Sequence, residues 1–307
     1  MTTSLDQFEA LNETVWRGLQ IAHPWNWELA LVSGPDTVGR CSFVDRTYQR
    51  LEVYFRPVKG EVDPELILSQ HRQPDKNAEI TNLPNPPAGY KALLRTYPDM
   101  KRTHAAKFFP GANILAEVAI LWPDARDEAL ETTLLDAIEP LDPDAPPFLW
   151  DAFGLCVRAG KPWILEDCQT EVGEVQWTFS QPDIKKRKRP TIMIQRDALP
   201  EQMVGGFPTL REFLTSLLPA GSTVRSAEPV NHNAHQGMRL ISRSRRSPAA
   251  TALGLHTLRY DEGWVCDVEN RFYNLTMTRS SRDEDICWPD DVTIECCRRN
   301  PITEGKL

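Results

Sequence analysis

Eight basic residues in two short stretches have side chains that could neutralise the phosphates of a nucleic acid or of another polyanion. Lys and Arg release condensed counterions when they bind such a backbone. The candidate polyanion-binding residues are Lys185, Lys186, Arg187, Lys188, Arg189, Arg243, Arg245 and Arg246. The first five could instead form a solvated hairpin tip, which the sequence favours because no aromatic residue that could stack on a base interrupts them.

Cysteine and histidine are the residue types that could ligate a metal ion. The seven cysteines are Cys41, Cys156, Cys168, Cys266, Cys287, Cys296 and Cys297. The last three could cluster with Cys266 around zinc, but adjacent cysteines rarely ligate one tetrahedral ion. His232 and His235 have a suitable spacing on a helix, yet Pro229 and the asparagines around them indicate an exposed loop. We therefore predict reduced, mostly buried thiols, with no metal and no cofactor.

Known catalytic motifs are incomplete in this sequence. Trp122-Pro123-Asp124 matches the acid loop of protein tyrosine phosphatases, but no cysteine has the Cys-x5-Arg spacing that cradles a phosphate beside a thiolate. The segment from Gly34 to Cys41 has the glycine spacing of a phosphate loop but lacks the Lys that must follow. We accordingly predict no catalytic residue and expect the protein not to be an enzyme.

Composition and charge are those of a soluble globular protein. The 307 residues are 41% apolar and 25% charged, enough for about two domains with their own cores. The net charge of −8 lies in residues 1–150, which hold 14 Lys and Arg against 22 Asp and Glu; the remaining residues hold 21 of each. No basic segment followed by an apolar one begins the chain, so we expect a cytoplasmic location without membrane insertion.

The chain repeats a pattern of residues past its midpoint. Gly18-Leu19, Pro24 and Trp27 are matched by Gly154-Leu155, Pro162 and Trp163 at a similar spacing. Such self-similarity predicts a tandem duplication. The proline-rich run between Pro140 and Pro147 indicates a linker. We predict a first domain over residues 1–140, a linker over 141–150 and a second domain over 151–307.

Hydrophobic periodicity predicts both helices and strands in each half. Helices are expected at residues 5–14, 125–138 and 210–218, and strands account for most of the remaining patterned segments. Trp25, Trp27, Trp163 and Trp177 lie in or beside early strands, where large rings most often anchor a core. The predicted fold class is α+β, with two tandem domains that each contain a mainly antiparallel sheet covered by helices.

This order of elements resembles the Mog1/PsbP/DcrB-like group of α/β/α sandwiches. The resemblance rests on the element order and on patterns such as the strand-like run from Ala116 to Trp122 leading into a helix. It implies helices on both faces of an antiparallel sheet, and small binding, chaperone-like or accessory roles. It carries over no functional residue.

The duplication and the incomplete catalytic motifs favour a non-enzymatic binding or accessory protein that presents a surface formed by two related domains to a protein partner. The first alternative is nucleic-acid binding through the basic loops of the second domain. The second is a hydrolase or small-molecule enzyme with a site between the domains, where clefts commonly form. The sequence leaves the oligomeric state open.

Overall fold

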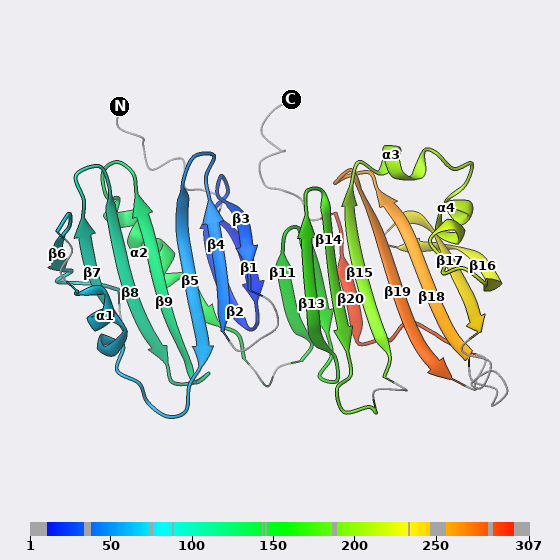
Figure 1. Ribbon diagram of the computed structural model, residues 1–307, viewed down its shortest axis with the longest axis horizontal. Coiled ribbons are helices and arrows are strands. Elements are labelled where there is room, and N and C mark those ends of the chain that lie inside the picture. Colours follow the sequence, from blue (N-terminus) through cyan, green and yellow to red (C-terminus); the bar gives the residue numbers. More distant parts are fainter. Residues whose placement is uncertain are drawn as a thin grey trace. The chain divides into compact units, whose positions relative to one another are not determined.

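The computed structural model describes residues 11–33, 38–73, 76–87, 89–142, 144, 146–185, 189–232, 234–245, 256–281 and 285–297 (Figure 1). Strands account for about 56% of these residues and helices for about 11%. The predicted α+β class is therefore wrong, because the chain is mostly antiparallel β-structure in three sheets. No helix in the described ranges is both long enough and apolar enough to cross a bilayer.

Two compact units make up the chain. Unit 1 contains the described residues up to 144 and Leu149–Gly154, and unit 2 contains Pro146–Phe148 and the described residues from Leu155 onward. The predicted linker over 141–150 includes the start of a strand at Phe148. Each unit is described separately below.

Unit 1 is built on a seven-stranded antiparallel sheet with the order β3-β4-β5-β9-β8-β7-β6. Its strands are β3 (Glu28–Val32), β4 (Gly39–Val44), β5 (Gln49–Pro57), β6 (Glu79–Asn82), β7 (Tyr90–Thr96), β8 (Lys101–Phe109) and β9 (Ile114–Trp122). Unit 1 also contains the first four strands of a second, six-stranded sheet. In order across that sheet they are β10 (Ile138–Pro140), β2 (Leu19–Pro24), β1 (Leu11–Trp16) and β11 (Phe148–Ala152). The helices are α1 (Glu65–His71) and α2 (Glu128–Asp136).

The two faces of the unit 1 sheet differ in polarity because side chains alternate along each strand. On strand β5, Leu51, Val53 and Phe55 are buried in the core, whereas Glu52 and Tyr54 point to the other face. Helix α1 lies on this polar face (Figure 1). Its Leu68 packs against Leu93 of β7 and Ala106 of β8.

Unit 2 has a seven-stranded antiparallel sheet of the same connectivity, with the order β13-β14-β15-β19-β18-β17-β16. Its strands are β13 (Ile164–Glu171), β14 (Glu174–Ser180), β15 (Thr191–Ala198), β16 (Ser222–His232), β17 (His235–Arg245), β18 (His256–Cys266) and β19 (Arg271–Ser281). Strand β12 (Leu155–Ala159) pairs with β20 (Val292–Glu295). Helices α3 (Pro200–Val204) and α4 (Leu210–Ser216) precede β16, and α4 packs on β17 and β18.

The same tight turn lies at the matched glycines of the two halves. Arg17 and Gly18 have φ of 52° and 78° between β1 and β2, and Phe153 and Gly154 have 53° and 71° between β11 and β12. Positive φ at both central residues belongs to a two-residue hairpin turn, which glycine accommodates most easily. Strands β1 and β2 therefore form a tight hairpin.

The resemblance to Mog1/PsbP/DcrB-like α/β/α sandwiches is also wrong. That arrangement needs helices long enough to cover sheets, whereas the longest described helix, α2, has nine residues. The segment predicted as helix 5–14 is strand from Leu11 onward, and its earlier residues lie outside the described part. Local periodicity overestimated helix here because pairing with distant strands overrides weak local propensity.

Candidate functional site: a polar pocket in unit 1

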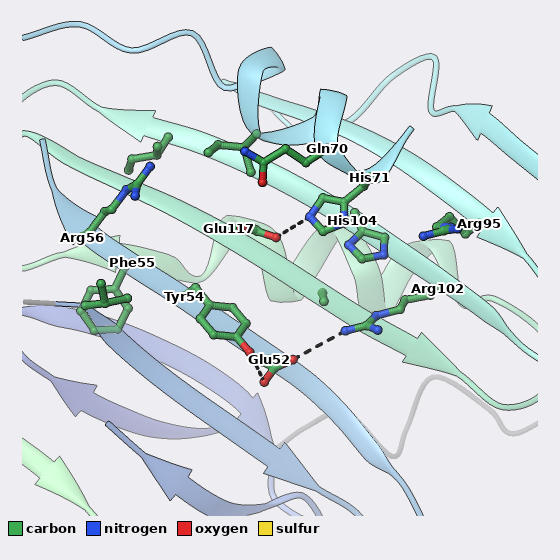
Figure 2. Close-up of a pocket in the computed structure, with 14 residues that line it drawn as sticks. Glu52, Tyr54, Phe55, Arg56, Gln70, His71, Arg95, Arg102, His104 and Glu117 are labelled. Atoms are coloured by element: carbon green, nitrogen blue, oxygen red, sulfur yellow. Dashed lines mark hydrogen bonds and ion pairs between the residues drawn. The ribbon is translucent and has the colours of Figure 1, made fainter. Parts of the chain in front are cut away.

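A polar pocket of about 470 Å³ lies on the open face of the unit 1 sheet (Figure 2). Its floor comes from strands β5, β8 and β9, and helix α1 contributes Ile67, Gln70 and His71. The pairing register brings the floor together, since Tyr54 stands opposite Glu117, and Ala119 lies between Glu52 and His104. Directly opposed residues share a face, so these side chains line one concave surface.

Glu52 is held by several donors although its side chain is largely buried. Its carboxylate accepts hydrogen bonds from the Tyr54 hydroxyl at 2.7 Å and from Arg40 Nε at 2.8 Å, and Arg102 Nη2 lies 3.5 Å away. Burial alone would raise the pKa of the Glu52 carboxyl, but the hydrogen bonds from Tyr54 and Arg40 hold the pKa below its usual range. Glu52 is therefore a fixed anion.

Two histidines from distant segments meet in the pocket. His71 Nε2 lies 2.6 Å from Glu117 Oε1, and the His71 ring stacks on that of His104 with centroids 4.1 Å apart. His104 is 4% exposed, and neither of its ring nitrogens has a hydrogen-bond partner within the described ranges. Burial, with a smaller contribution from nearby His71, lowers the pKa of His104 to about 3, so His104 is neutral at physiological pH.

His71, His104 and Glu117 have donor atoms close enough to one another to suggest a metal site. A ring nitrogen binds a metal through a lone pair in the ring plane at about 2.0–2.1 Å. The two rings are inclined by only 23°, so their lone pairs run nearly side by side rather than to a common point. As they are arranged, these histidines do not converge on one ion. They suit hydrogen bonding and proton transfer instead.

The positively charged side chains that line this pocket are arginines. Arg56, Arg95 and Arg102 line it together with the anionic Glu52 and Glu117, each of which already contacts a donor. This local excess of positive charge contrasts with the acidic composition of residues 1–150. A planar guanidinium binds carboxylates and phosphates with two parallel hydrogen bonds, so the pocket is suited to an anionic group.

A second pocket, of about 490 Å³, lies in unit 2. Within it, Glu262 accepts hydrogen bonds from Arg239 Nη2 at 3.0 Å and from the Tyr260 hydroxyl, and it lies 3.2 Å from His232 Nδ1. Burial alone would raise the pKa of the Glu262 carboxyl, but these hydrogen bonds lower it to about 2. Arg239, which borders the second basic stretch, therefore belongs to an internal ion-pair network.

The predicted polyanion-binding residues fall partly outside the described ranges. These are Lys186, Arg187, Lys188 and Arg246, and nothing is described of the Arg245 side chain. Arg189 donates to Glu166 Oε1 at 2.9 Å and to two backbone carbonyl oxygens, and Arg243 contacts His256. Two of the candidates therefore already contact other residues of the chain.

Arg189 and Arg243, one described residue from each basic stretch, lie at the same end of the unit 2 sheet. Thr191, two residues after Arg189, is paired through Thr278 and Arg259 to Ser242, which precedes Arg243. Strands β15 and β17 are three strand spacings apart, which is about 14 Å. The sequence alone could not place these two arginines relative to each other.

Sequence reasoning missed the polar pocket. One signal was present, because Glu52, Tyr54 and Arg56 alternate with apolar residues along one strand and must share a face. The strand order decides that these side chains lie near Glu117 and His104, and no local pattern in the sequence reveals the strand order.

No family model matches the chain, and no curated protein matches it. Among solved structures, the immunity protein TplEi of the T6SS from Pseudomonas aeruginosa, complexed with "L" peptide, aligns over 92% of this chain and 93% of its own. The identity is 8% and the TM-score is 0.36. A likeness this distant carries no argument about this chain.

Proposed function

We propose that this protein is a non-enzymatic binding protein and that its unit 1 pocket receives an acidic segment of a protein partner. The observation that carries the proposal is the group of three arginines around a pocket whose own carboxylates are already occupied. A cytoplasmic location is part of the same proposal.

The composition of the pocket favours a protein over a small molecule as the ligand. Its basic residues are arginines rather than lysines, and it also contains Tyr54 and the 45%-exposed Val38. Arginine and aromatic residues are enriched at protein interfaces, where lysine is depleted. Buried, neutral His104 adds a polar group that could hydrogen-bond to a carboxyl or amide of the partner.

A fluorescently labelled glutamate-rich peptide would test the proposal by anisotropy at two salt concentrations. We expect Arg56→Ala and Arg102→Ala each to weaken binding about tenfold, because each removes one charge-assisted contact. Arg46→Ala is the matched control, since Arg46 is exposed in the same unit but does not line the pocket. Equal binding by all four proteins would contradict the proposal, as would tighter binding of inorganic phosphate than of the peptide.

Nucleic-acid binding by unit 2 is the second candidate, and the location of Arg189 and Arg243 at one end of the sheet supports it. If it is correct, binding to a short duplex will weaken with salt, and neutralising residues 185–189 will reduce that salt dependence. The control variant replaces Lys59 and Lys91, which lie in unit 1, with uncharged residues. Equal binding by the two variants would count against this candidate.

An enzymatic role is the second alternative that the sequence left open. His71 Nε2 lies 2.6 Å from Glu117 Oε1, so hydrolysis in this pocket would use the two as an acid–base pair. Broad ester and amide substrate screening with wild-type protein and Glu117→Gln distinguishes the two roles. Turnover that is lost in the variant would replace the binding proposal with an enzymatic one.

A further inference from the structure

Four metal-ligating side chains from three separate segments of unit 2 meet at one point. They are His235 at the start of β17, Cys266 at the end of β18, and Cys296 and Cys297 directly after β20. Their donor atoms all lie within 4.8 Å of one another. His235 Nε2 is 2.7 Å from Cys297 Sγ, which in turn is 3.5 Å from Cys266 Sγ.

The strand register explains why His235 and Cys266 meet. Gly237 stands opposite Trp264 in the antiparallel pair of β17 and β18, so continuing this register by two residues puts His235 opposite Cys266. Residues two apart on a strand share a face. Both side chains therefore leave the end of the sheet on the same side.

The backbone at Cys297 explains how two adjacent cysteines reach the same point. In an extended strand, neighbouring side chains point to opposite faces, which is why adjacent cysteines rarely bind one ion. Cys297 has a φ of 60°, in the left-handed region that a non-glycine residue seldom adopts. This turn breaks the alternation and brings Cys297 to the same cluster as the buried Cys296.

We propose that His235, Cys266, Cys296 and Cys297 form a structural zinc site. Three cysteines and one histidine are a standard tetrahedral set for Zn²⁺, with Zn–S near 2.3 Å and Zn–N near 2.0–2.1 Å. Those bond lengths separate neighbouring ligand atoms by roughly 3.6–3.8 Å, so the cluster needs only small side-chain rotations. Binding displaces the three thiol protons, and the complex then carries one negative charge.

All four positions around the ion would be filled by protein atoms, which is typical of a structural site. Its role is to hold the segment after β20 to the end of β17 and β18. The fourth cysteine of this part of the chain, Cys287, is exposed and lies outside the cluster. It provides a matched control within the same segment.

A disulfide between Cys266 and Cys297 is the competing interpretation of their 3.5 Å separation. It would leave Cys296 and His235 without a role in the cluster, and it requires an oxidant. The zinc site accounts for all four residues. The inference is independent of the proposed function, which concerns unit 1.

The test is to purify the full chain under reducing conditions, remove metal with a chelator and titrate it with Zn²⁺. We expect one zinc per chain by elemental analysis, a higher melting temperature on binding, and release of protons. Cobalt substituted for zinc should give the intense visible bands of a tetrahedral thiolate site and thiolate-to-cobalt charge transfer.

Cys266→Ser, Cys296→Ser and His235→Gln should each lower the zinc affinity at least tenfold, whereas Cys287→Ser should leave it unchanged. The wild-type cobalt spectrum keeps the test decisive even if a variant fails to fold. A wild-type chain that binds less than one zinc, or that yields a Cys266–Cys297 disulfide-linked peptide when cells are lysed with a thiol-alkylating reagent and no reductant, would overturn the proposal.

Discussion

Glu174 and Asp197 stand directly opposite each other on strands β14 and β15, so that two carboxylates share a cross-strand position. Asp197 is only 3% exposed, and its Oδ1 accepts one hydrogen bond, from Gln195 Nε2 at 3.1 Å. Its Oδ2 is buried without a partner in the described ranges. Burial, together with the nearby Glu174 charge, raises the pKa of Asp197 to about 6.

Replacing Asp197 should therefore stabilise the protein at neutral pH. Because the folded-state pKa lies above the unfolded value, ionised Asp197 costs stability above about pH 6, and the cost disappears below about pH 4. We expect Asp197→Asn to raise the free energy of unfolding by about 1–3 kcal/mol at about pH 7.5. Urea unfolding at several pH values measures this. Equal gains at pH 4 and pH 7.5 would show that the effect is not electrostatic.

Glu52 has the opposite pH behaviour. Its pKa is lowered in the folded state, so its contribution to stability is present above the unfolded pKa and is lost as pH falls through the folded pKa. Glu52→Gln should cost about 1–3 kcal/mol at neutral pH, because it removes the charge that Arg40 and Tyr54 contact. The difference from wild type should shrink at low pH in chemical unfolding curves. Exposed Glu28→Gln is the control and should change little.

Leu68 attaches helix α1 to the sheet and thereby positions the pocket. It is fully buried against Leu93 and Ala106, while His71 of the same helix lines the pocket. Leu68→Ala should cost about 2–4 kcal/mol of stability and weaken binding of the acidic peptide. Leu66→Ala, at a 63%-exposed position of the same helix, should leave both quantities nearly unchanged. Thermal melts and the anisotropy titration measure the two effects, and equal losses in the two variants would contradict this role.

The absence of a side chain at Gly39 allows the Phe55 ring to approach strand β4 closely. A Cβ at this position would be 2.2 Å from the ring carbon Cζ of Phe55, which is 4% exposed and cannot easily move away. We expect Gly39→Ala to cost about 1–3 kcal/mol through overpacking. Gly111→Ala, where no atom lies within 4 Å of a new Cβ, is the control. Partial rescue by adding Phe55→Leu would locate the strain in this contact.

Burial of the tryptophans shows how far single residues could be predicted. Trp27, Trp163 and Trp177 are in the core, as expected from their size and strand context, whereas Trp25 is 44% exposed. Trp25 and Trp27 are two apart, but Trp25 lies in the turn after β2 rather than in a strand, so alternation does not apply to it.

Polar strands were underestimated because they do not show apolar alternation clearly. Strands β16 and β17 each span eleven residues, yet β16 is mostly solvent-facing and reads locally as a loop. The pairing of His232 with His235 at their hairpin was missed for the same reason.

The amino-acid sequence by itself determined the acidic first half of the chain and the burial of Trp27, Trp163 and Trp177. These properties depend on residue type and short spacing. The tertiary structure decided the strand order and with it both candidate sites. His71 meets Glu117 across 46 residues, and His235 meets Cys297 across 62. Contacts over such separations arise from sheet pairing and from one left-handed residue, and neither is encoded in a local pattern.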